Sequence, residues 1–139
     1  MKTRVLDSWA ILEWMSGRQP ATDFVARLLA EADAGETRLL MSAINVGEVY
    51  YFLRKSHSES LAESWRESSR TLPVTIEVPT ADDIWNAAIL KSRHPIAYAD
   101  AFAAALARKH GCPLVTGDAE LQRVDALEIE WIGGGGARG

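Results

Sequence analysis

Cysteine is almost absent from this chain, because Cys112 is the only one among 139 residues. A single cysteine cannot form an intrachain disulfide, and it excludes a zinc site built on several thiolates. Long apolar runs are missing too, since none reaches the roughly 18 residues of a membrane-spanning helix. The N-terminus opens on a short apolar strand and not on a signal peptide. Together these absences predict a cytoplasmic protein without a membrane partner.

A surplus of basic residues is also lacking, since 19 Asp and Glu face 15 Lys and Arg, for a net charge of -4. Domains that bind duplex DNA usually carry such a surplus, so this balance argues against them without excluding other nucleic acids. The length and the 47% of hydrophobic residues suit one folded domain. We expect this domain to span residues 1–132, and the glycine-rich end, 133–139, to be a flexible tail.

Apolar runs alternate with segments of helical periodicity along the whole chain. Strands are expected at 3–6, 37–41, 74–78, 113–116 and 127–132. Helices are expected at 9–16, 20–34, 43–55, 58–69, 81–94, 97–110 and, briefly, from residue 119. This alternation predicts an α/β fold, a single domain whose central parallel sheet of about five strands carries helices on both faces. The segment 43–55 is apolar around most of its circumference, so we expect it to be buried.

Two acidic residues directly follow expected strands. Asp7 comes after the apolar run that ends at Leu6, and Asp118 follows the run 114–116 and a glycine. The carboxyl ends of parallel strands are where open α/β sheets bind ligands. Each of these residues could equally be no more than the N-cap of the next helix.

Two further acids lie on expected helices, with no Lys or Arg three or four residues away. The neighbours of Glu48 at that spacing are apolar or uncharged, and those of Asp100 are Ile96 and three alanines. A carboxylate on a buried helix face needs a compensating charge. The alternatives are that Glu48 points to solvent and that Asp100 is favoured by the helix dipole in a first turn.

A parallel sheet would bring these four carboxylates to one edge. Clustered carboxylates repel one another unless a cation lies between them. Oxygen ligands without cysteine or histidine select Mg²⁺ or Mn²⁺ over Zn²⁺. Such ions typically meet substrate phosphates, where they activate water and stabilise the leaving oxygen, so the pattern predicts phosphodiester hydrolysis.

Four short motifs occur in a fixed order: VLDS near the N-terminus, SAIN leading to Gly47 and Glu48, AYADAFAAALARKHG, and LVTGDAEL. In this order and spacing they resemble the motifs of PIN-domain ribonucleases, and above all those of VapC-type toxins from toxin–antitoxin pairs. The resemblance covers nearly the whole chain. It implies a homodimer that a co-expressed antitoxin holds inactive. Its implied antitoxin contacts, which core or dimer packing would explain equally well, are Trp9, Trp14, Tyr51 and Phe52.

The resemblance also assigns site residues. It implies that Mg²⁺ or Mn²⁺ is held by four acids: Asp7, Glu48, Asp100 and Asp118. It implies supporting roles for three polar residues: Ser8, Asn45 and Thr116. Glu120 could replace or assist Asp118 as the fourth acid.

We therefore expect a Mg²⁺-dependent endoribonuclease, the toxin of a type II pair, that cuts single-stranded or looped RNA. The alternative is a non-catalytic, degenerate PIN-like module that acts only through its protein partner. An aspartate-based phosphatase is disfavoured, because Trp9 stands where that class has a second Asp. Five basic residues could line an RNA path or simply be solvated: Arg4, Arg54, Lys55, Arg93 and Arg108.

Overall fold

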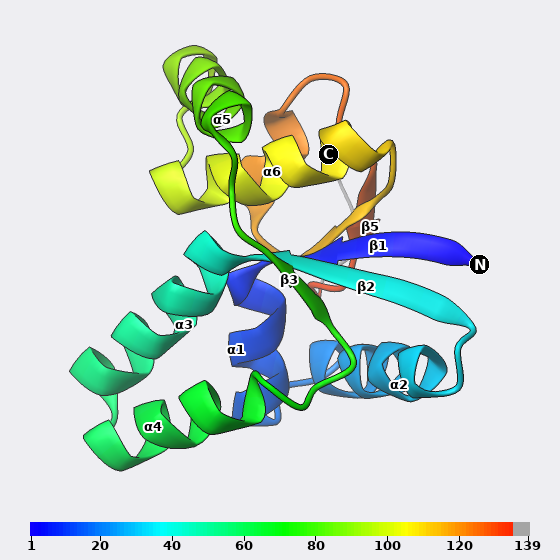
Figure 1. The fold of residues 1–139 in the computed structure, drawn as a ribbon, viewed down its shortest axis with the longest axis vertical. Coiled ribbons are helices and arrows are strands. Elements are labelled where there is room, and N and C mark those ends of the chain that lie inside the picture. The colour runs from blue at the N-terminus through cyan, green and yellow to red at the C-terminus, as the bar shows by residue number, and fades with distance from the viewer. Residues whose placement is uncertain (135–139) are drawn as a thin grey trace.

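Five parallel strands lie at the centre of the structure, a computed structural model that describes residues 1–134 (Figure 1). They are β1 (Lys2–Leu6), β2 (Thr37–Ser42), β3 (Thr75–Glu77), β4 (Leu114–Thr116) and β5 (Ile129–Trp131). Their order across the sheet is β3-β2-β1-β4-β5, and each neighbouring pair is parallel. The predicted sheet is therefore confirmed. Most of the predicted tail, from residue 135, lies outside the described residues.

The helices begin and end where local sequence signals place them. They are α1 (Ser8–Ser16), α2 (Ala21–Asp33), α3 (Ala43–Ser56), α4 (Glu59–Ser68), α5 (Ala81–Arg93), α6 (Tyr98–His110) and the 3₁₀ turn η1 (Ala119–Arg123). Thr80 and Asp83 form a capping box at the start of α5. Gly17 and Gly111 end α1 and α6 with φ of 77° and 59°, a left-handed conformation that glycine adopts freely. Within residues 1–134, every helix is too short or too polar to cross a bilayer.

Two helical layers cover the sheet: α1 to α4 pack on one face, and α5 and α6 pack on the other (Figure 1). Alternate strand residues enter the two cores, as the pleat of a strand requires. In β1, Val5 joins the core beside α6, whereas Leu6 joins the core beside α1. The backbone of Asp7 is still extended, so this residue follows Val5 toward α6.

Helix α3 is less buried than its composition predicts. Only Asn45, Val49 and Leu53 are buried along it, whereas Tyr51 and Phe52 are 58% and 41% exposed. The buried residues are spaced by four, so they form one stripe, which faces α1, α4 and α6. The expectation of a helix buried around most of its circumference is therefore wrong, because no element within residues 1–134 covers its other side.

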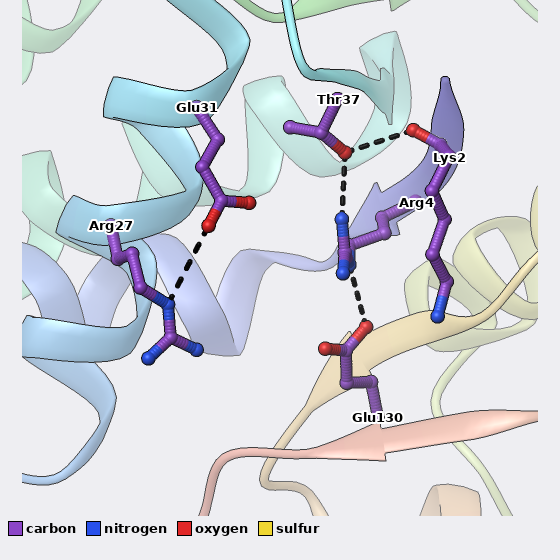
Figure 2. Close-up of polar contacts among 6 residues, drawn as sticks. All are labelled: Lys2, Arg4, Arg27, Glu31, Thr37 and Glu130. Atoms are coloured by element: carbon purple, nitrogen blue, oxygen red, sulfur yellow. Dashed lines mark hydrogen bonds and ion pairs between the residues drawn. The ribbon is translucent and has the colours of Figure 1, made fainter.

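A polar network joins the start of β2 to the middle of β1 and the middle of β5 (Figure 2). Arg4 donates from Nε to Glu130 Oε1 at 2.7 Å and from a terminal nitrogen to Thr37 Oγ1 at 2.7 Å. Thr37 in turn donates to the carbonyl oxygen of Lys2 at 2.8 Å. Arg4 therefore links β1, β2 and β5. Its guanidinium is engaged within the fold and its side chain is 14% exposed, so the alternative that Arg4 is simply solvated is wrong.

Candidate metal centre

Asp7 lies at the carboxyl end of β1 and is fully buried. One of its carboxylate oxygens accepts a hydrogen bond from the Ala10 backbone N–H at 2.8 Å, which caps α1. The other oxygen accepts from the hydroxyl of Thr116, the last residue of β4. The helix cap considered for Asp7 is thus present, and the same side chain is also tied to the end of β4.

Three carboxylates form the tightest group of this edge. Asp100, Asp118 and Glu120 each offer one oxygen, and these oxygens lie within 4.8 Å of one another. Asp118 also caps η1, because its Oδ1 accepts from the Glu120 N–H at 3.0 Å. The 3₁₀ turn thereby brings Glu120 into the group as well as Asp118. Asp7 and Glu48 border this group without belonging to it.

Glu48 is held by two polar side chains. The hydroxyl of Ser8 donates to Glu48 Oε1, and Asn45 Nδ2 approaches the same oxygen at 3.5 Å. Asn45 is fully buried and also donates to the carbonyl oxygen of Ala99 at 3.0 Å. Because Ala99 precedes Asp100, Asn45 connects the helix that bears Glu48 with the helix that bears Asp100.

Burial and mutual repulsion perturb two of these acids strongly. Burial, followed by the negative charges of Asp118, Asp7 and Glu48, raises the pKa of Asp100 to about 8. Burial raises the pKa of Asp7 to about 7, although the hydrogen bonds from Thr116 and Ala10 oppose that rise. Burial above all, together with nearby negative charge, therefore disfavours the ionised forms of Asp7 and Asp100.

No cation of the described chain offsets this repulsion. Within residues 1–134, none of the five site acids forms an ion pair with Lys, Arg or His. Several carboxylate oxygens, no thiolate and no imidazole make a donor set that suits a hard divalent cation such as Mg²⁺ or Mn²⁺. Such a cation would restore the ionised forms that burial and repulsion disfavour.

Gly117, which sequence reasoning did not single out, lies between Thr116 and Asp118. A Cβ atom on Gly117 would stand 2.2 Å from Cη2 of Trp9. The indole of Trp9 therefore packs directly against this turn, and any side chain there would displace it. The position of Gly117 inside the TGD motif was the one signal in the sequence that could have pointed to it. The close approach of Trp9 is visible only in the folded structure.

Among known families, the family model of the PIN domain matches residues 4–127. No curated protein matches the chain.

Several solved structures resemble the chain at low sequence identity. DNA-bound VapBC from Salmonella typhimurium matches with a TM-score of 0.72 and 18% identity, over 94% of this chain and 98% of that one. VapBC2 from Rickettsia felis, bound to a promoter DNA fragment, matches with a TM-score of 0.71 and 18% identity, over 92% of this chain and 97% of that one. The Sarcin-Ricin loop cleaving toxin VapC20 from Mycobacterium tuberculosis matches with a TM-score of 0.64 and 19% identity, over 87% of this chain and 93% of that one. Such similarity establishes a common fold.

Proposed function

The chain belongs to the PIN domain family, and on that premise we propose that it is a Mg²⁺-dependent endoribonuclease that hydrolyses RNA phosphodiester bonds. One observation carries the proposal: the buried carboxylates Asp7 and Asp100 gather with Glu48, Asp118 and Glu120 at the carboxyl edge of the sheet, and no cation within residues 1–134 pairs with them. Such an arrangement is unfavourable without a ligand, and a divalent cation is the ligand that it fits.

We assign some of the site residues to binding the cation and others to positioning those ligands. Asp100, Asp118 and Glu120 would hold the cation, with Asp7 and Glu48 beside them. When bound, Mg²⁺ would lower the pKa of a water molecule and neutralise charge on the phosphate.

The chain's own hydrogen bonds fix the geometry of these acids. Thr116 orients Asp7 through its hydroxyl and accepts from the Asp118 N–H at 3.0 Å, so it fixes two acids at once. Ser8 and Asn45 hold Glu48. No side chain of the protein has to act as a general base.

We further propose that the protein is the toxin of a type II toxin–antitoxin pair and acts in the cytoplasm. The VapBC complexes of similar fold and the RNA-cleaving toxin VapC20 support this assignment. A hollow of about 350 Å³ between α1, α3 and α4, lined largely by apolar side chains, is a suitable surface for an antitoxin. Trp9 and Phe52, two of the predicted antitoxin contacts, line this hollow, whereas Trp14 and Tyr51 do not.

A homodimer belongs to the same proposal. Trp85 on α5 is 67% exposed, and Val78, just before that helix, is 77% exposed. Large apolar side chains that remain this exposed favour contact with another protein surface. We assign that surface to a second copy of the chain.

RNA cleavage by the purified protein tests the proposal. We expect the wild type to cut single-stranded RNA in Mg²⁺ and not in EDTA, and Asp100→Asn to be inactive although folded. The matched control is Asp23→Asn, a change of the same charge on the exposed side of α2, which should leave activity intact. Cleavage that persists in EDTA or in Asp100→Asn would contradict the proposal. A folded wild type that neither binds Mg²⁺ nor cuts RNA would favour the non-catalytic module.

A further inference from the structure

A hollow lies between α5 and α6, apart from the acidic edge. It has a volume of about 410 Å³. Its walls include Asn86, Ile89 and Arg93 from α5, and Ala105, Arg108 and Lys109 from α6. We call it the α5–α6 groove. Three of these six side chains are cationic, and none is acidic.

The charge around this groove differs from that of the whole chain. Helices α5 and α6 carry four bases, Lys91, Arg93, Arg108 and Lys109, against three acids, Asp82, Asp83 and Asp100. None of these acids lines the groove, whereas three of the bases do. The groove lining is thus basic although the protein as a whole has a net charge of -4, and it favours an anionic ligand.

The two arginines of the groove are also unengaged. Arg93 and Arg108 are exposed, and neither makes an ion pair or a side-chain hydrogen bond within residues 1–134. Lys109, by contrast, is paired with Asp83 at 3.2 Å. A guanidinium presents planar, paired donors that match the oxygens of a phosphate. Arg93 and Arg108 are therefore the side chains that remain free to bind one.

Helix α6 connects this groove with the acidic edge. Asp100 lies in its first turn, whereas Ala105, Arg108 and Lys109 lie in its second half. At about 1.5 Å per residue, the groove residues are roughly 7–14 Å along the helix axis from Asp100. A polyanionic chain that follows α6 would place one phosphate at the acids and others at the arginines.

We propose that the α5–α6 groove binds the phosphate backbone of single-stranded RNA next to the point of cleavage, an inference that rests on the ribonuclease function proposed above. The groove supplies the attraction for RNA that the acidic edge lacks, and phosphate contacts fix the register of the strand without reading its sequence. A two-fold contact between copies through the same groove would bring like charges face to face. The charge thus favours RNA as the occupant.

The experiment measures binding of a fluorescently labelled single-stranded RNA by anisotropy, at several salt concentrations. EDTA is present throughout, so that the groove is tested whether or not the protein cuts RNA. The variant is Arg93→Gln/Arg108→Gln. The control is Arg66→Gln/Arg70→Gln, which removes two exposed arginines that pair with Glu63 and Glu67 on α4.

We expect the groove variant to raise Kd roughly tenfold and to reduce the slope of log K against log salt by about 1.4, the value for two lost single-strand contacts. The control should change neither quantity by a comparable amount. Equal Kd and slope in the wild type and the groove variant would overturn the proposal. So would a loss of dimer mass in light scattering with unchanged RNA binding, because the groove would then be an interface between copies. Failure of the wild type to cleave RNA in Mg²⁺ is a separate result, which overturns the ribonuclease function.

Discussion

Strand β1 carries opposite charges on the two sides of its buried residues Val5 and Leu6, and the two charges have different surroundings. Before the buried pair Val5 and Leu6 stands Arg4, whose guanidinium is engaged by Glu130 and Thr37 (Figure 2). After that pair stands Asp7, which is buried beside other carboxylates and has no cationic partner within residues 1–134. The charge on the Arg4 side of β1 is therefore paired within the fold, whereas the charge on the Asp7 side is not paired within residues 1–134. We call them the matched and the unmatched end of β1.

The difference indicates what each end contributes. Removing one partner of a largely buried, hydrogen-bonded charge pair is costly, because the other partner is left uncompensated. Buried charges of one sign without partners weaken the folded state, and this is the usual mark of a functional site. We therefore propose that the Arg4 side of β1 serves stability and that its carboxyl end, at Asp7, serves a ligand.

The largest effect is expected for Asp7→Asn. Asparagine keeps an oxygen that can cap α1 through the Ala10 N–H but loses the charge, so the fold should persist while RNA cleavage falls by more than about 100-fold, beyond the usual loss for a residue that only supports a ligand. Initial rates of RNA cleavage in Mg²⁺ measure this loss. The control is Glu130→Gln, which changes the partner of Arg4 and should leave the rate of RNA cleavage unchanged. Equal losses of rate in both variants would contradict the difference between the Arg4 side and the Asp7 side of β1.

A smaller effect is expected for Thr116→Val, which removes the hydroxyl that joins Asp7 to the Asp118 backbone while keeping a similar shape. Residues that orient metal ligands typically contribute about 10–100-fold to metal affinity or activity. The Mg²⁺ concentration that gives half-maximal cleavage should rise accordingly, and Thr116→Ser should restore it. If Thr116→Ser were as impaired as Thr116→Val, packing and not the hydroxyl would explain the loss.

At the matched end, Arg4→Met should lower stability without affecting chemistry. The change leaves the buried Thr37 and the half-buried Glu130 without their donor, which costs about 1–3 kcal/mol. Urea unfolding should show this decrease, and the folded variant should cleave RNA at the wild-type rate. A loss of activity at full stability would place Arg4 in the RNA path after all.

The smallest expected effect is the pH dependence of the metal-free protein. The folded pKa values of Asp7 and Asp100, about 7 and about 8, exceed the ordinary 3.8. Between about pH 4 and pH 8 the folded state therefore binds more protons than the unfolded state, and its stability falls as the pH rises. Tm in EDTA should be several degrees lower at pH 8 than at pH 5.5, whereas Mg²⁺ should raise Tm more at pH 8. A Tm in EDTA that rises from pH 5.5 to pH 8 would contradict the raised pKa values of Asp7 and Asp100.

Much of this organisation is predictable from sequence because its signals are local. Caps such as Thr80 and the apolar runs of the strands place the elements, and the strand-end rule brings Asp7 and Asp118 to one edge. Arg4 and Glu130 pair although they are 126 positions apart in the sequence, and no local pattern predicts such a pairing. Glu120 joins the acids only because η1 is a tight 3₁₀ turn. The exposure of one side of α3 likewise depends on which helices pack beside it.

Binding of Mn²⁺ by isothermal titration tests the central claim most directly. The wild type and Glu130→Gln should bind the ion with equal affinity near pH 7.5, whereas Asp100→Asn should bind at least about tenfold more weakly. This result would mean that the unmatched end of β1 is a cation site and that the matched end is not. Equal Mn²⁺ affinity in Asp100→Asn and the wild type, or no binding by the wild type, would contradict the account.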